Sequence, residues 1–203
     1  MMTKEEFLTK VWNYYLMLEK DFMNAFQYVE PSVDNNSAYS KEYNKLLLSI
    51  GSEIDVVFKE LCKKIENKNS SDVENYNITN YMNVISNYNN FSNENCTNLV
   101  TREIISPFTE WINCKTPLWW KNYNHLKHDR LSNDNIKIGN YLNVKESLAA
   151  LYIICRFLYK TSYSKEPIPK SNLFQMNNWP VYTELGNGFL QVADEHGLSF
   201  YAN

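Results

Sequence analysis

Residues 38–66 read AYSKEYNKLLLSIGSEIDVVFKELCKKIE, and the spacing of the apolar residues in this stretch decides the fold class. Apolar side chains recur every three or four positions, as they do on one face of an α-helix. They are Tyr39, Tyr43, Leu46, Leu47, Ile50, Ile54, Val57, Phe58, Leu61 and Ile65. We predict a long amphipathic helix that buries this face. Gly51 in its interior costs about 1 kcal/mol relative to Ala, a cost that is tolerated where another backbone packs close.

Other segments show a related periodicity. Residues 3–28 begin with Thr3 and Glu6 in the spacing of a capping box and end ahead of Pro31, which predicts a helix. A weaker, Asn-rich helix is predicted over 72–88, and a nearly all-core helix over 143–162 with Asn143 as its N-cap. We expect exposed loops at 89–98 and 131–141. Residues 99–105 fit a short strand or a helical turn equally well.

The C-terminal tail, residues 179–203, has a pattern typical of β-strands rather than of helices. Val181–Leu185 and Phe189–Ala193 flank Gly186-Asn187-Gly188, which predicts a β-hairpin, and Leu198–Tyr201 suits a third short strand. The predicted fold class is therefore mainly α, a helical bundle with a small C-terminal β-hairpin. We divide the chain into a helical domain, 1–165, and a short β-rich appendage, 166–203.

Charge and hydropathy exclude some classes of protein. The net charge of −3 argues against coating nucleic acid through bulk charge, although a local basic site remains compatible with it. The sequence contains no apolar run of about 18 residues, the length of a membrane span. Acidic residues at Glu5 and Glu6 stand where a signal peptide needs an apolar segment. We expect a cytoplasmic protein that does not contact a membrane.

The most function-like stretch is WWKNYNHLKHDR, residues 119–130, which holds two of the three histidines and two of the five tryptophans. Thr116-Pro117 marks the start of a helix there. At 100° per residue, Trp119, Tyr123, Leu126 and Arg130 project to one side of this helix. The opposite side collects polar groups, which are Lys121, Asn124, His125 and His128.

This polar face has two interpretations. Asn124 and His128 are neighbours at i and i+4, and Lys121, Lys127 and Arg130 add positive charge, so the face suits an RNA phosphate. Alternatively, it is only the wet side of an amphipathic helix. His125 and His128 lack a third ligand for zinc, and we expect no metal and no cofactor.

Glu53 lies at the border of the apolar stripe of residues 38–66. It is either a solvated flank or a carboxylate that reaches the polar face of residues 119–130, where it would orient an imidazole or a cation.

Asn124-His125-Leu126-Lys127-His128, followed by a long apolar helix, resembles the signature region of the HEPN superfamily. That family's motif is an Arg, a polar residue that is often Asn, a few variable residues and a His. Aligned on Asn124 and His128, the motif Arg falls on Tyr123, so the sequence departs from the pattern there. The resemblance covers residues 38–162 by helix order and five or six residues by motif.

The resemblance implies a bundle of four or five helices, often a dimer in which the two motifs face each other. Many such proteins are metal-independent ribonucleases of toxin–antitoxin or phage-defence systems, in which the RNA 2′-hydroxyl attacks. Carried over, His128 is the acid/base group and Asn124 the polar motif residue. Arg130 or Lys121 would replace the missing Arg, with Glu53 in support. His125, Lys127 and Tyr123 would contact RNA.

Two hypotheses of different classes follow. The first is a HEPN-like ribonuclease or RNA-binding protein, a homodimer with an antitoxin or another protein as partner. The second is a catalytically inactive protein–protein interaction module of the same helical fold. Tyr123 in place of Arg and the abundance of Tyr and Trp favour the second.

Overall fold

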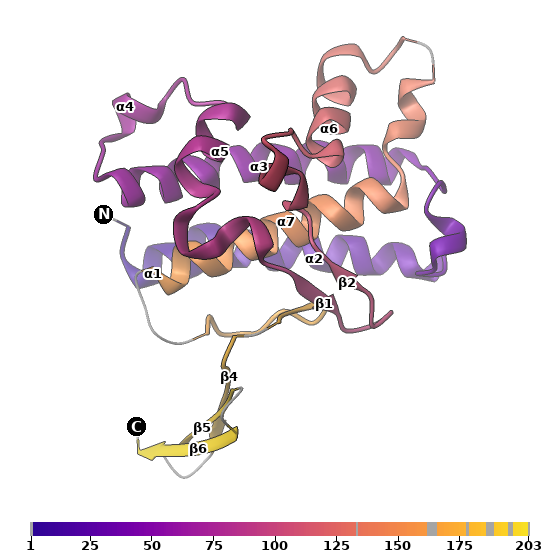
Figure 1. Cartoon of the computed structure of the whole chain (residues 1–203). Coiled ribbons are helices and arrows are strands. Elements are labelled where there is room, and N and C mark those ends of the chain that lie inside the picture. The colour runs from indigo at the N-terminus through magenta and orange to yellow at the C-terminus, as the bar shows by residue number, and fades with distance from the viewer. Residues whose placement is uncertain are drawn as a thin grey trace.

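A computed structural model describes residues 2–132, 134–161, 166–177, 179–185, 189–194 and 197–202. The protein is mainly helical, as the sequence predicts. The long helices of its body are α2 (Asn13–Asn24), α3 (Lys41–Glu66), α6 (Leu118–Asp129) and α7 (Tyr141–Lys160). Figure 1 shows α2 and α7 crossing the lower part of the body, with α3 and α6 above them.

The first predicted helix is confirmed. It begins with α1 (Lys4–Glu6) and continues through a π-helical segment, η1 (Phe7–Trp12), into α2 and a final 3-10 turn, η2 (Ala25–Gln27). Its capping box is formed: the Thr3 amide donates to Glu6 Oε2 at 2.9 Å, and the Glu6 amide donates to Thr3 Oγ1 at 3.2 Å. A short 3-10 turn, η3 (Val33–Asn35), follows.

Helices α3 and α7 begin side by side and run in the same direction (Figure 1). Tyr39 and Asn140, just ahead of the two helices, form an isolated β-bridge. Asn140 caps α7, since its Oδ1 accepts from the Asn143 amide at 3.0 Å. The predicted cap, Asn143, was therefore wrong by one turn. Helix α7 is buried along nearly its whole length, as predicted, because the other helices surround it.

Residues 70–113 form short elements. The weak helix predicted over 72–88 is divided into α4 (Ser70–Val73) and α5 (Ile78–Ile85). The 3-10 segment η4 (Tyr88–Asn93) and the strands β1 (Cys96–Asn98) and β2 (Ile104–Ile105) follow, and then the 3-10 turn η5 (Thr109–Asn113). Another 3-10 turn, η6 (Asn135–Ile138), lies within the loop predicted over 131–141.

The exposed loop predicted over 89–98 was wrong. Phe91, Cys96 and Asn98 are buried, and β1 is the central strand of an antiparallel sheet with the order β2-β1-β3. Strand β3 (Phe174–Met176) belongs to the segment that the sequence assigned to the appendage. Residues 162–165, where the predicted boundary falls, lie outside the described residues, and the division into two domains stays a prediction.

The C-terminal strands form a second antiparallel sheet. Strands β4 (Val181–Leu185) and β5 (Phe189–Asp194) make the predicted hairpin, and β6 (Gly197–Ala202) is the third strand. This sheet stands apart from the helices in Figure 1. The turn at 186–188 and His196 are outside the described part of the chain.

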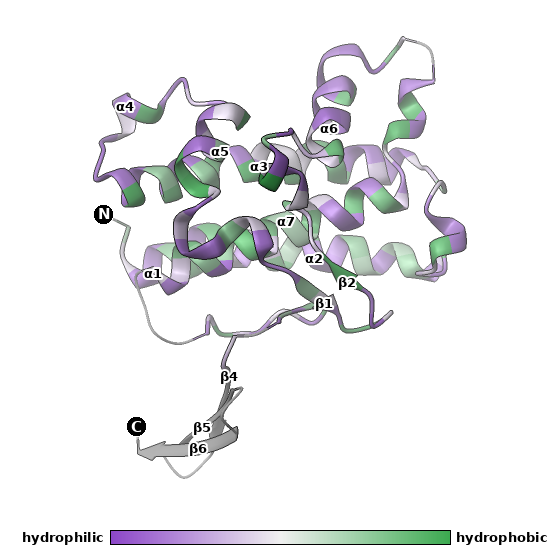
Figure 2. Ribbon diagram, viewed as in Figure 1, coloured by the Kyte–Doolittle hydropathy of each residue, from purple (hydrophilic) through white to green (hydrophobic). Residues whose placement is uncertain are grey.

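The sides of the helices that face the core carry mostly apolar residues, and the sides that face outward carry mostly polar ones (Figure 2). The core includes Tyr15 and Phe22 of α2, Ile54 and Phe58 of α3, and most of α7. Within the described ranges, no helix has both the length and the hydrophobicity needed to cross a bilayer.

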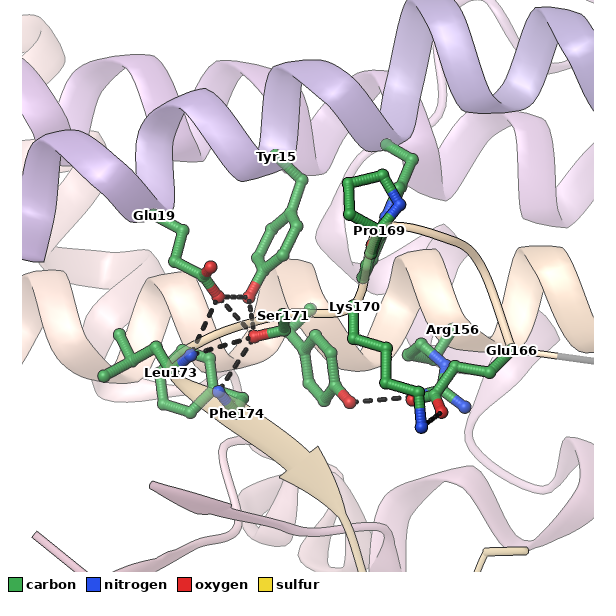
Figure 3. Close-up of polar contacts among 11 residues, drawn as sticks. Tyr15, Glu19, Arg156, Glu166, Pro169, Lys170, Ser171, Leu173 and Phe174 are labelled. Carbon is green, nitrogen blue, oxygen red and sulfur yellow. Dashed lines mark hydrogen bonds and ion pairs between the residues drawn. The ribbon is translucent and has the colours of Figure 1, made fainter. Parts of the chain in front are cut away.

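A buried polar cluster holds the segment after α7 against α2 (Figure 3). Tyr15 Oη donates to Glu19 Oε1 at 2.6 Å, the Ser171 hydroxyl bonds to the same carboxylate, and the Asn172 and Leu173 amides donate to it at 3.0 and 3.3 Å. Burial, followed by the neighbouring Glu19 charge, raises the pKa of Tyr15 well above its ordinary value. The carboxylate thus satisfies four donors from two distant parts of the chain.

An ion pair between Arg156 and Glu166 lies beside that cluster. Arg156 of α7 is 4% exposed, and its Nη1 forms an ion pair of 2.6 Å with Glu166 and donates to Tyr152 Oη at 2.8 Å. Together the two clusters fix residues 166–174 on the body, which allows β3 to reach β1.

Candidate functional site

Helix α6 packs into the protein through its aromatic side. Trp119, Trp120, Tyr123 and Leu126 are buried, as expected of the apolar face of an amphipathic helix. Trp119 Nε1 donates to the Pro107 carbonyl at 2.8 Å, so its one polar atom is satisfied within the core. Tyr123, predicted to contact RNA, is only 3% exposed. It is a core residue.

The other side of α6 faces solvent. The exposed residues are Leu118, Lys121, His125, Lys127, His128, Asp129 and Arg130. Arg130, which an ideal helix directs toward the aromatic side, is exposed because α6 ends at Asp129 and Arg130 is its C-cap. We call the exposed charged residues and imidazoles of α6 and its C-cap the α6 face.

No ion pair neutralises the α6 face within the described residues. Nine ion pairs occur elsewhere in those ranges, and none includes a residue of 118–130. Lys127 lies over the Tyr123 ring, 5.6 Å from its centroid. Asp129, the one carboxylate of α6, accepts from Ser132. With three cations and the single carboxylate of Asp129, the face carries a net positive charge.

A cleft of about 280 Å³ adjoins the α6 face between α3, the start of α5 and α6. Its lining residues are Ser52, Asp55, Tyr76, Asn77, Ile78, Trp120, Tyr123, Asn124 and Lys127. Asn124 Nδ2 donates to the Trp120 carbonyl at 3.1 Å, which fixes the amide at the edge of the cleft. Asn124 and Lys127 lie in the cleft, whereas Lys121, His125 and His128 do not line it.

The carboxylate that α3 contributes to the cleft is Asp55. Its Oδ1 accepts from Tyr81 Oη at 2.6 Å and its Oδ2 pairs with Lys59 at 2.8 Å. Burial, followed by the hydrogen bond to Asp55, raises the pKa of Tyr81 well above its ordinary range. At 100° per residue, Asp55 projects away from the apolar stripe of residues 38–66. The segment 76–78 covers that side of α3, which the sequence does not reveal.

Glu53 lies elsewhere. It is half-buried, does not line the cleft, and burial raises its pKa. Its charge raises the pKa of Cys155 on α7, after the larger effect of that thiol's own burial. Glu53 therefore lies near α7, and its expected reach to the polar face of α6 stays a prediction.

Larger concavities occur elsewhere. One of about 560 Å³ lies between α2 and residues 169–172, and one of about 320 Å³ lies at the C-terminal end of α3. One of about 380 Å³ lies between residues 103–113, Trp119 and Glu146. None of the three is lined by a residue of the α6 face. Within the described residues, no group of three or more His, Cys, Asp or Glu side chains is arranged to hold a metal ion.

Comparison of the chain with protein-family models, with curated proteins and with solved structures finds no match.

Proposed function

We propose that this protein binds RNA through the α6 face and cleaves it without a metal ion, as a HEPN-like ribonuclease. The observation that carries the proposal is the net positive charge of the α6 face, where Lys121, Lys127 and Arg130 outnumber the single carboxylate of Asp129 in a chain with net charge −3. An excess of cations creates a local positive potential, which attracts a polyanion.

The position of Lys121 supports binding over helix stabilisation. Cations at the C-terminal end of a helix interact favourably with its dipole, which accounts for Lys127 and Arg130 on stability alone. Lys121 lies near the N-terminal end of α6, where the dipole disfavours positive charge. Its presence on the same exposed face is better explained by a bound anion.

His128 suits proton transfer at the bound phosphate. An imidazole exchanges a proton near neutral pH, and His128 is exposed between Lys127 and Arg130. In the proposed step the RNA 2′-oxygen bonds to phosphorus while His128 takes the 2′-hydroxyl proton. The bond from phosphorus to the 5′-oxygen breaks, and that oxygen takes a proton from water. The products are a 2′,3′-cyclic phosphate and a 5′-hydroxyl.

The negative charge that develops on the phosphate oxygens needs a cation. In the HEPN pattern an Arg provides it, at the position occupied here by Tyr123. Because Tyr123 is buried, we assign this role to Arg130, with Lys121 as the second candidate. Asn124 would orient the phosphate as the polar motif residue.

The proposal includes partners. We propose a homodimer that brings two α6 faces together, and an antitoxin or other protein partner, in a cytoplasmic phage-defence setting. Sedimentation equilibrium of the purified protein measures the first of these. A monomer at all concentrations would remove the dimer from the proposal and leave RNA binding standing.

The decisive experiment is incubation of the full chain with a mixed RNA panel in EDTA, beside His128→Ala and, as a control, Lys45→Ala. Lys45 is exposed and paired with Glu42, remote from α6 in sequence. We expect cleavage by the wild type and by Lys45→Ala, and none by folded His128→Ala. Unchanged cleavage by His128→Ala would refute its role, and a wild type that neither binds nor cleaves RNA would refute the proposal.

An inactive interaction module is the second candidate. Leu131 and Leu118, which flank α6, are 91% and 56% exposed. Apolar side chains beside a charged face suit a protein partner. The buried tryptophans of α6 no longer support this alternative, since their rings belong to the core. Retained binding of an affinity-purified partner by His128→Ala, with no RNA activity in the wild type, would favour it.

A further inference from the structure

The cleft beside the α6 face has a feature that phosphate binding does not use. Lys127 belongs both to the cleft and to the exposed face, so a phosphate held by Lys127 would leave the adjoining nucleoside at the mouth of the cleft. Building on the RNA-binding function proposed above, we infer that this cleft takes one nucleobase of the bound RNA and discriminates between bases.

The size of the cleft suits a single ring system. Its volume of about 280 Å³ falls just below the range of roughly 300–1,000 Å³ that is usual for drug-sized ligands. Such a space admits one planar heterocycle and excludes a folded peptide or a dinucleotide. The bound element is therefore one base, with the sugar and phosphate outside.

The walls of the cleft are aromatic and rigid. Trp120 and Tyr123 lie with ring centroids 5.2 Å apart and are 6% and 3% exposed, so they form a fixed floor. Tyr76 is held at its hydroxyl, which donates to Glu66 at 3.0 Å and accepts from Lys68 at 2.7 Å. Tyr76, which is half-buried, is the ring on which a base can stack, while Trp120 and Tyr123 contribute only their edges. Walls that are ordered before binding reduce its entropic cost.

Two amides supply the means to distinguish bases. Asn77 Oδ1 caps α5 by accepting from the Thr79 and Asn80 amides at 2.9 and 3.4 Å, and no side-chain partner of its Nδ2 occurs among the described residues. Asn124 has the opposite arrangement. Its Nδ2 donates to the Trp120 carbonyl, and its Oδ1 accepts no hydrogen bond from the described residues. The two amides thus offer one donor and one acceptor, and the Ser52 hydroxyl, which also lines the cleft, can act as either.

The edge of a nucleobase carries hydrogen-bond donors and acceptors that can pair with these two amides. The arrangement of donors and acceptors differs from base to base, so the amides can favour one base over the others. Asp55 does not repel the ligand with a free charge, since Lys59 and Tyr81 occupy its two oxygens. Among the described lining residues, the Lys127 ammonium is the charge without a carboxylate partner, and it lies over the Tyr123 ring.

Asn77→Asp tests the inference directly. Asp caps a helix as well as Asn does, so α5 keeps its start while the cleft loses the Nδ2 donor. The matched control is Asn80→Asp, which adds the same charge three residues later and outside the cleft. Affinities of the full chain and both variants are measured for four single-stranded RNA homopolymers and for the four uncharged nucleosides.

We expect the wild type to prefer one homopolymer and its nucleoside by at least about fivefold, the low end of one good base contact. Asn77→Asp should lose this preference, and Asn80→Asp should keep it. RNA bound with equal affinity for all bases, or equal behaviour of the two variants, would overturn the inference and leave RNA binding intact. Failure of the wild type to bind any RNA would instead remove the function on which the inference rests.

Discussion

The ring of Tyr123 lies directly against Gly51. A Cβ atom built on Gly51 would come within 2.3 Å of Tyr123 Cδ2 and 2.5 Å of Cε2, far closer than atoms can approach. Because Gly51 has no side chain, it leaves space on α3 into which the Tyr123 ring of α6 packs. Since Tyr123 anchors α6 at this depth, the contact also determines which residues of α6 face solvent.

Gly51→Ala should destabilise the protein by about 1–3 kcal/mol, because the added methyl group overpacks a filled site. The gain in helix propensity, about 1 kcal/mol, opposes this effect and is smaller. Urea unfolding measures the difference, with exposed Val56→Ala as the control on the same helix. In a Tyr123→Ala background the cost of Gly51→Ala should shrink; an equal cost in both backgrounds would contradict the contact.

Glu19→Ala should cost about 3 kcal/mol or more, since it leaves several buried donors without an acceptor. Tyr15, Ser171 and the Asn172 and Leu173 amides are the donors involved. Hydrogen exchange should quicken first at the amides of residues 172–174. The control is exposed Glu5→Ala. A loss of stability without faster exchange at residues 172–174 would show that the buried Glu19 cluster does not hold that segment.

Glu146→Gln should stabilise the protein at pH 7 and have little effect near pH 4. Burial raises the pKa of Glu146 above 4.5; Lys145 lowers it, and Glu110 and Glu103 raise it further. A carboxyl whose folded-state pKa is raised favours folding below its unfolded value and loses that contribution as the pH rises through the folded value. Glutamine mimics the protonated form.

Urea titrations of Glu146→Gln at pH 4 and pH 7, with the exposed Glu30→Gln variant alongside, measure this dependence. A variant less stable than the wild type at pH 7 would reverse the sign and show that the ionised carboxylate is favoured in the folded state.

Lys127→Gln should weaken RNA binding and make it less dependent on salt. Each phosphate contact to single-stranded RNA contributes about 0.7 to the slope of log affinity against log salt concentration, so the slope should fall by about that amount. Fluorescence anisotropy across a salt series measures it. Lys45→Gln removes a lysine that is already paired with Glu42 and should leave the slope unchanged. The same slope in Lys127→Gln would mean that its ammonium does not contact phosphate.

Helices were predictable from sequence where local periodicity carried the information. Most of the apolar faces indicated over residues 3–28 and 38–66 are buried, and the capping box of Thr3 and Glu6 is present. The predicted start of the second helix was wrong, because Ser40 caps α3 and Tyr39, ahead of it, is exposed. Strand β1 was not predictable, because its partner β3 lies near residue 175 and no local pattern in residues 89–98 marks a pairing at that separation. Asn140 and Asn143 are equally good caps locally, and the start of α7 at Asn140 coincides with long-range contacts to Tyr39, Ala38 and Asn36.

The candidate site was likewise predictable from sequence only in part. The sequence alone placed Lys121, His125 and His128 on one side of α6, because helical geometry relates them without reference to the rest of the chain. The exposure of Arg130 was not predictable in this way, since it depends on where α6 ends. Only the tertiary structure decided that Asp55 and Asn77 join Asn124 around a cleft and that Glu53 does not. Residues from three elements meet there because Tyr123 packs into Gly51, and such long-range packing depends on shape that the linear pattern of polar and apolar residues does not contain.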